Sequence, residues 1–171
     1  GAAILDNSIT LAGNLSWCIG SGDSTVLTVN PADSIQWFKN NIAIPGANQT
    51  VYRVTATGIY HAVVFNFSGC VLSTLSQDVN ISSIPVSGFT VNNPAQCQLN
   101  NKFIFTNSST NTVGPIAYKW YFGDGATATT RDVTYSYKTP GIYRVVMTVN
   151  SNAVCADSAT LTINVYPNIK A

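Results

Sequence analysis

One pattern of residues occurs twice in this chain, about 83 residues apart, and this repeat constrains the fold more than any other feature. The first copy contains Cys18, Trp37, Gly58-Ile59-Tyr60 and Cys70, and the second contains Cys97, Trp120, Gly141-Ile142-Tyr143 and Cys155. In both copies the Trp and the Gly lie 21 residues apart, whereas the cysteine spacings differ by a few residues. A fixed internal spacing with variable ends indicates two copies of one small module.

Short stretches rich in Val, Ile, Thr, Tyr and Phe recur along the chain, separated by Gly, Pro, Asn and Asp. No stretch shows a sustained helical apolar period, so we expect strands throughout. The expected strands are 25–29, 35–39, 50–54, 60–67 and 75–81, followed by 102–106, 117–122, 133–137, 143–149 and 159–166. Strands of this length and spacing predict an all-β chain of two tandem immunoglobulin-like antiparallel β-sandwiches.

The same pattern predicts the domain boundaries. Residues 1–82 are expected to form the first sandwich, and residues 83–88, which include Pro85, a short linker. Residues 89–167 are expected to form the second sandwich. Residues 168–171 are expected to begin another linker, because the end of the last strand resembles the segment that precedes the first linker.

The four cysteines bear on stability and cellular compartment. One pair in each copy favours the disulfides Cys18–Cys70 and Cys97–Cys155. Each would close a loop of roughly 50–60 residues and stabilise its module by about 4 kcal/mol. Four free thiols and a four-cysteine metal site are the alternatives, but zinc sites usually contain close C-x-x-C pairs, which this chain lacks. Disulfides would indicate an oxidising compartment, and therefore an extracellular location at the cell surface or in secreted form.

Composition argues against several functional classes. Charged residues make up 9% of the chain, the formal net charge is +1 and there is no basic run, so we expect no nucleic-acid partner. No apolar run approaches the roughly 18 residues that cross a bilayer, so we expect no membrane insertion. The single histidine, His61, has no nucleophile motif near it, and the seven acidic residues are scattered Asp. We therefore predict that the chain is not an enzyme and needs no cofactor.

The second copy contains a more specific motif. Trp120-Tyr121-Phe122-Gly123-Asp124-Gly125 is followed by Tyr135-Ser136-Tyr137 and then by a Pro-Gly-Ile-Tyr segment that ends at Tyr143. This sequence resembles the PKD-domain family, whose hallmark is W-D-F-G-D-G, a tyrosine strand and P-G-x-Y-x-V. The resemblance covers roughly residues 86–167. Tyr121 stands where the hallmark has its first Asp.

The first copy is similar to the Ig-like repeats that accompany PKD domains in surface proteins of Bacteroidetes. The similarity rests on Cys18, Gly22-Asp23, Trp37-Phe38-Lys39-Asn40, Ile44-Pro45-Gly46-Ala47, Gly58-Ile59-Tyr60 and Gly69-Cys70. It implies a non-catalytic spacer or adhesion segment of a large bacterial cell-surface protein, of the kind found in gliding-motility adhesins. The partners would be neighbouring repeats of the same long chain, surface glycans or other surface proteins. The alternative is an accessory, carbohydrate-binding region of a secreted hydrolase.

Structural roles are expected for most of the repeated residues. Trp37 and Trp120 are predicted to lie in the sandwich cores, and Tyr60 and Tyr143 at tyrosine-corner positions. The Phe122 strand end and the Gly123-Asp124-Gly125 segment are expected to form a tight turn, because Asp caps such turns and Gly adopts positive φ.

A calcium site near Asp124 is the alternative for that turn, with Asp23 and Asp132 also near predicted turns. Calcium sites usually bring two or more carboxylates together, and this chain has no D-x-D run. We therefore expect no bound metal.

Strand alternation predicts one apolar surface. If Tyr60 points inward, Val63 and Phe65 point outward, and if Trp37 points inward, Phe38 points outward. Phe38, Val63 and Phe65 would form a candidate contact surface, although coverage by a loop or by residues 3–11, or a register error, is the interpretation that we favour.

Trp17, which has Gln96 at the matching place in the second copy, could stack on a sugar, but packing over the adjacent disulfide is favoured.

Overall fold

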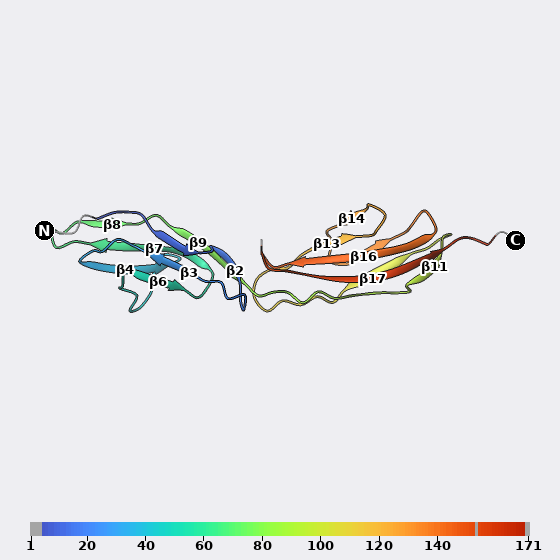
Figure 1. Ribbon diagram of the computed structural model, residues 1–171, viewed down its shortest axis with the longest axis horizontal. Coiled ribbons are helices and arrows are strands. Elements are labelled where there is room, and N and C mark those ends of the chain that lie inside the picture. Colours follow the sequence, from blue (N-terminus) through green and yellow to red (C-terminus); the bar gives the residue numbers. More distant parts are fainter. Residues whose placement is uncertain (1–4, 153, 170–171) are drawn as a thin grey trace. The chain divides into compact units, whose positions relative to one another are not determined.

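The computed structural model describes residues 5–152 and 154–169. The chain divides into two compact units, Gly1–Ser82 and Ser83–Ala171, which are described separately (Figure 1). All regular elements among the described residues are β-strands. Within this part of the chain there is no helix of the length and hydrophobicity needed to span a membrane.

The first unit is a sandwich of two sheets. The smaller sheet has the order β1 (Thr10–Gly13), β3 (Thr25–Thr28) and β6 (Val51–Val54). The larger sheet has the order β2 (Ser16–Cys18), β9 (Gln77–Ser82), β7 (Gly58–Phe65), β4 (Ser34–Lys39) and β5 (Ile42–Ala43), with β8 (Val71–Ser73) also paired to β7. The short strand β2 runs parallel to β9, and the other pairs are antiparallel.

The second unit repeats this arrangement strand for strand. Its smaller sheet has the order β10 (Phe89–Val91), β12 (Phe103–Asn107) and β15 (Val133–Tyr135). Its larger sheet has the order β11 (Ala95–Cys97), β17 (Ala156–Tyr166), β16 (Gly141–Asn150), β13 (Ala117–Tyr121) and β14 (Thr127–Ala128). Here β17 pairs with the whole length of β16, whereas in the first unit the corresponding partner of β7 is divided into β8 and β9.

Each sandwich encloses its own core, formed by the inward side chains of alternating strand positions. The first core contains Leu27, Val29, Ile35, Trp37, Val54, Tyr60, Ala62, Val64, Val79 and Ile81. The second contains Phe103, Phe105, Trp120, Phe122, Tyr137, Val145, Met147, Val149, Ile163 and Val165. Trp37 and Trp120 are fully buried. Their indole N–H groups donate to the backbone carbonyls of Gln49 and Thr130, each over 2.9 Å, so neither core retains an unpaired indole.

All ten strands expected from the sequence are present, with ends shifted by a few residues. The strands that were not expected are short, from two to four residues, and include β2 and β11. Strands this short contain too few positions for an alternating pattern to be recognised.

The segment expected to be a linker, residues 83–88, packs on the second unit. Val86 forms a bridge with Thr110, with N–O distances of 2.9 and 3.0 Å, and the backbone N–H of Ser87 donates to Asp157 over 2.8 Å. At the other end, Asn168 accepts a hydrogen bond from the backbone of Leu99 over 2.8 Å. Residues 170–171 of the second expected linker lie outside the described residues.

In each unit the chain begins at one end of the long strands and leaves at the other. In the first unit Asp6 accepts a hydrogen bond from Asn30, near the end where β7 finishes, whereas the unit ends at Ser82, beyond the start of β7. In the second unit Ser87 lies beside Asp157 at the start of β17, and the chain leaves after Tyr166 at its end. Because β17 has 11 residues, this unit spans roughly 35 Å between the two points.

Candidate functional site

The Gly123-Asp124-Gly125 segment forms the turn between β13 and β14 of the second unit. Gly123 and Gly125 have φ of +85° and +95°. A Cβ on Gly123 would lie 2.9 Å from the backbone oxygen of Arg144, so this position needs glycine for space as well as for conformation. Oδ1 of Asp124 accepts from the backbone N–H of Ala126 over 3.1 Å, which closes the turn.

The other carboxylate oxygen of Asp124 binds an aromatic cluster. Oδ2 accepts from the hydroxyl of Tyr135 over 2.7 Å, and the Tyr135 ring stacks on Phe122 with centroids 4.0 Å apart. Tyr137 meets Tyr135 edge-on and stacks on Tyr143, and its hydroxyl donates to the carbonyl of Phe122 over 2.7 Å. Burial, and then the hydrogen bond and charge of Asp124, raise the pKa of Tyr135 to about 12, while burial also raises the pKa of Tyr137. Both hydroxyls therefore serve as neutral donors that hold the turn against β15.

The Asp residues considered for calcium have other partners. Oδ1 of Asp132 accepts from the backbone of Asn107 over 2.8 Å, and Asp23 accepts from the hydroxyl of Ser21 over 2.8 Å. Asp124 uses both oxygens within its own turn and aromatic cluster. In residues 5–152 and 154–169 no three His, Cys, Asp or Glu side chains come together as a metal-binding group. Asp23, Asp124 and Asp132 thus each bind protein groups of their own unit.

Tyr60 and Tyr143 occupy the same position in the two units and make the same contact. Each hydroxyl donates to the carbonyl four residues earlier, Ala56 over 2.6 Å and Thr139 over 2.9 Å. A tyrosine hydroxyl that bonds back to the preceding backbone at this corner is the tyrosine-corner arrangement of immunoglobulin-like sandwiches. These residues secure the corner that starts β7 and β16.

The predicted cysteine pairs are wrong. Cys18 and Cys155 are disulfide-bonded, whereas Cys70 and Cys97 are free and exposed, so neither Cys18–Cys70 nor Cys97–Cys155 is formed.

The reason is that the two cysteines of each unit lie at opposite ends of its larger sheet. Cys97 pairs with Tyr166 and Cys155 precedes Ala156, the first residue of β17. In the first unit Cys18 pairs with Ser82, beyond the start of β7, and Cys70 follows the end of that strand. Each separation is roughly 30 Å or more, against a Cα separation of about 4.4–6.8 Å in a disulfide.

The outer face of β4 and β7 carries the residues expected there. Tyr60, Ala62 and Val64 are buried, while Val63 is half-buried and Phe65 is 36% exposed. Phe38 is half-buried and stacks on His61 with centroids 5.0 Å apart. The register places Gln36 opposite Val63, Ser34 opposite Phe65 and His61 opposite Phe38. Each apolar side chain of the candidate contact surface therefore has a polar residue opposite it across the β4–β7 pair. The inward and outward positions are thus as the alternation predicts, without a register error.

Trp17 is half-buried and packs against the first core, and its indole N–H donates to the hydroxyl of Thr25 over 3.0 Å. The first unit therefore uses this side chain in packing at the end of β2. Packing of Trp17 over the adjacent disulfide stays a prediction.

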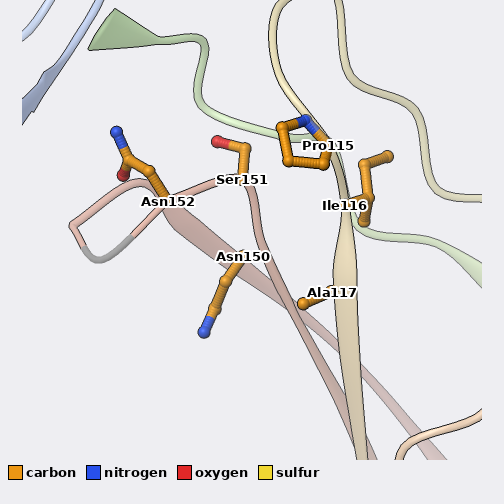
Figure 2. A pocket seen from close by; sticks show the side chains of 6 residues that line it. All are labelled: Pro115, Ile116, Ala117, Asn150, Ser151 and Asn152. Atoms are coloured by element: carbon orange, nitrogen blue, oxygen red, sulfur yellow. The ribbon is translucent and has the colours of Figure 1, made fainter. Parts of the chain in front are cut away.

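Figure 2 shows a shallow hollow of about 330 Å³ in the second unit. Pro115, Ile116 and Ala117 line one side and Asn150, Ser151 and Asn152 the other. None of the six lining side chains is an acid, a base or a thiol. The hydroxyl of Ser151 donates to the carbonyl of Ser83 over 2.6 Å, and the side-chain oxygen of Asn152 accepts from the backbone of Cys155 over 2.6 Å. These polar groups hold the local backbone, and the hollow contains no acid–base pair.

Residues 83–165 match the family described as PKD domain. The second unit is a PKD domain. In this PKD domain the Gly-Asp-Gly turn, the tyrosine strand and the Tyr143 corner are the elements whose geometry is described above. A search of curated proteins finds no significant match to the chain.

Several solved structures are similar to the chain. Murine CEACAM1b matches with a TM-score of 0.63 and 11% identity over 94% of this chain and 100% of that chain. The amphioxus IgVJ-C2 molecule matches with a TM-score of 0.56 and 12% identity over 87% of this chain and 99% of that chain. The PKD1 domain of the Vibrio cholerae metalloprotease PrtV is 30% identical over 48% of this chain and 96% of that domain, with a TM-score of 0.41. The first two similarities show the fold, which is a pair of immunoglobulin-like β-sandwiches of which the second is the PKD domain.

Proposed function

We propose that the chain is a non-catalytic extracellular module pair, a spacer and adhesion segment of a large bacterial cell-surface protein of the Bacteroidetes gliding-motility adhesin type. The observation that carries this proposal is the path of the chain through each unit. The chain enters each sandwich at one end of its long strands and leaves at the other, and the second module adds roughly 35 Å of length in this way. A module whose two chain ends lie at opposite ends of its long strands is suited to lengthening a surface protein.

The chemistry of the repeated residues supports a structural role. The hydroxyls of Tyr60 and Tyr143 and the indoles of Trp37 and Trp120 all bind backbone carbonyls of their own unit. The disulfide-bonded state of Cys18 and Cys155 agrees with an oxidising, extracellular location. We propose that the segment works without nucleic acid or membrane insertion.

Adhesion would use the candidate contact surface of Phe38, Val63 and Phe65, with a neighbouring repeat, another surface protein or a surface glycan as partner. Replacing Phe65 by Ser tests this surface, because Phe65 is 36% exposed. Phe67→Ser is the matched control, since Phe67 is 89% exposed and follows the same strand. Loss of adhesion in folded F65S but not in F67S supports the surface. Equal adhesion in both variants argues against it.

We propose that no metal is required. The two units should therefore melt at the same temperatures in excess calcium and in a chelator. A ligand present at 100 times its dissociation constant would stabilise its unit by about 2.7 kcal/mol, which a melting experiment detects readily. A rise in the midpoint of the PKD domain with calcium contradicts this proposal.

The second candidate is an accessory, carbohydrate-binding region of a secreted hydrolase. The sequence beside this segment in its parent protein separates the two candidates, because further modules support the spacer and an adjoining catalytic domain supports the accessory role. A glycan array with the purified chain tests the carbohydrate-binding part directly.

The decisive experiment is deletion of this segment from the parent surface protein, with adhesion of the cells as the readout. Insertion of an unrelated tandem immunoglobulin pair of equal length should restore the reach but not a specific contact. Full rescue supports a spacer, and partial rescue supports a spacer with its own adhesive surface. Unchanged adhesion after deletion contradicts both.

A further inference from the structure

The fold places cysteines at two kinds of position, each of which occurs once in each unit. Cys18 and Cys97, the strand cysteines, are the last residues of the short parallel strands β2 and β11. Cys70 and Cys155, the turn cysteines, immediately precede β8 and β17.

The two turn cysteines also share their local geometry. The carbonyl of Cys70 accepts from the backbone of Asn66 over 3.1 Å, and the carbonyl of Cys155 accepts from the backbone of Ser151 over 2.9 Å. In both cases the donor lies four residues earlier, directly after the preceding long strand. The two turn cysteines therefore accept the same backbone hydrogen bond, although Cys155 is fully buried and Cys70 is exposed.

In each class of cysteine, one member is disulfide-bonded and the other is a free thiol. One strand cysteine, Cys18, and one turn cysteine, Cys155, are disulfide-bonded. The other member of each class, Cys97 and Cys70, is free and exposed. The position that supports a disulfide in one unit thus recurs, with an accessible thiol, in the other.

We propose that Cys70 and Cys97 are assembly sites, at which a disulfide joins Cys97 of one copy of this chain to Cys70 of a second copy. A bond within one unit is excluded, because the strand cysteine and the turn cysteine of a unit lie at opposite ends of its sheet. The proposed bond joins one strand cysteine to one turn cysteine. The two cysteines that are already disulfide-bonded, Cys18 and Cys155, are likewise one strand cysteine and one turn cysteine. This inference goes beyond the proposed function, since a spacer needs no covalent link between copies.

The chemistry is thiol–disulfide exchange with a small-molecule disulfide, such as oxidised glutathione, as the oxidant. The Cys70 thiolate attacks glutathione disulfide, forms a mixed disulfide and releases one glutathione thiolate. The Cys97 thiolate of the second copy then attacks Sγ of Cys70, and the second glutathione leaves. Two protein thiols are oxidised by two electrons in total, and one glutathione disulfide is reduced to two glutathione molecules.

The test uses the single variants Cys70→Ser and Cys97→Ser, alone and mixed, in a glutathione redox buffer. Both side chains are exposed and unbonded, so each variant should fold, and circular dichroism with thermal melting checks this. Each variant alone retains only one of the two assembly thiols. The mixture contains a Cys97 thiol on one chain and a Cys70 thiol on the other, and should form a covalent dimer.

We expect the mixture to yield at least about tenfold more dimer than either variant alone, because only the mixture contains both the strand thiol of Cys97 and the turn thiol of Cys70. Peptide mapping without reduction should identify Cys70 joined to Cys97. The double variant should remain monomeric. A mixture that stays monomeric at redox equilibrium, or equal dimer yields in the mixture and in the separate variants, would overturn the proposal while leaving the spacer function intact.

Discussion

Tyr135 donates its hydroxyl to Oδ2 of Asp124 over 2.7 Å, while Oδ1 of the same carboxylate accepts from the backbone of Ala126 over 3.1 Å. One carboxylate thus closes the β13–β14 turn and ties it to β15. This relationship gives the acid of the Gly-Asp-Gly segment a structural role.

Asp124→Ala should therefore destabilise the PKD domain by about 1–2 kcal/mol, because it removes both acceptors. Asp124→Asn retains a side-chain oxygen that can close the turn, and should cost less. Tyr135→Phe removes only the hydroxyl contact and preserves the ring stacked on Phe122. Denaturant unfolding of the three variants should rank D124A as the least stable, and an unchanged midpoint for D124A would contradict the assigned role.

Because the pKa of Tyr135 is raised in the folded state, the free energy of unfolding of the PKD domain should fall at strongly alkaline pH. The folded pKa is about 12 against an ordinary value of 10.0, so folding favours the protonated hydroxyl. The stabilisation from this group is fully present below pH 10 and is lost as the pH rises through 12. Tyrosinate absorbance should show late-titrating tyrosines in the native chain, with one fewer in Y135F, because the pKa of Tyr137 is raised as well. A Tyr135 that titrates near pH 10 in the folded chain would show that this hydrogen bond is not maintained.

Gly123 and Gly125 provide a matched pair, because both have positive φ but only Gly123 lacks room for a Cβ. Gly125→Ala should cost about 1 kcal/mol from backbone conformation alone. Gly123→Ala should cost about 3 kcal/mol, since its Cβ also meets the Arg144 carbonyl. Equal destabilisation of the two variants in equilibrium unfolding would mean that the backbone here relaxes freely.

The two tyrosine corners should act on their own units. Tyr60→Phe removes the hydrogen bond to Ala56, and Tyr143→Phe the one to Thr139, each at a cost of about 1 kcal/mol. Hydrogen exchange should show lower protection in the first unit for Y60F and in the second for Y143F. Tyr166→Phe, at a side chain that is 52% exposed, is the control and should change neither unit. Loss of protection in both units from one substitution would contradict separate cores.

Much of this architecture could be predicted from the sequence, because long strands carry local signals. The alternation in 60–67 and 143–149 indicated the inward side chains of β7 and β16, and the Trp and Gly-Ile-Tyr repeat indicated two cores. The short strands β2 and β11 were not predicted. The end of the sheet at which Cys18 and Cys97 lie was therefore not predicted either. Whether such a strand runs parallel or antiparallel to its neighbour depends on long-range pairing. A repeat in the sequence reveals equivalent positions but not the end of the sandwich at which each lies.

The two cysteines of each module lie at opposite ends of its larger sheet, and peptide mapping without reduction tests this placement most directly. The unfolded, unreduced chain is alkylated, digested and analysed by mass spectrometry. In the monomer, kept apart from any disulfide oxidant, we predict alkylated Cys70 and Cys97, with Cys18 and Cys155 recovered as free peptides only after reduction. Peptides that join Cys18 to Cys70 and Cys97 to Cys155 would contradict the account.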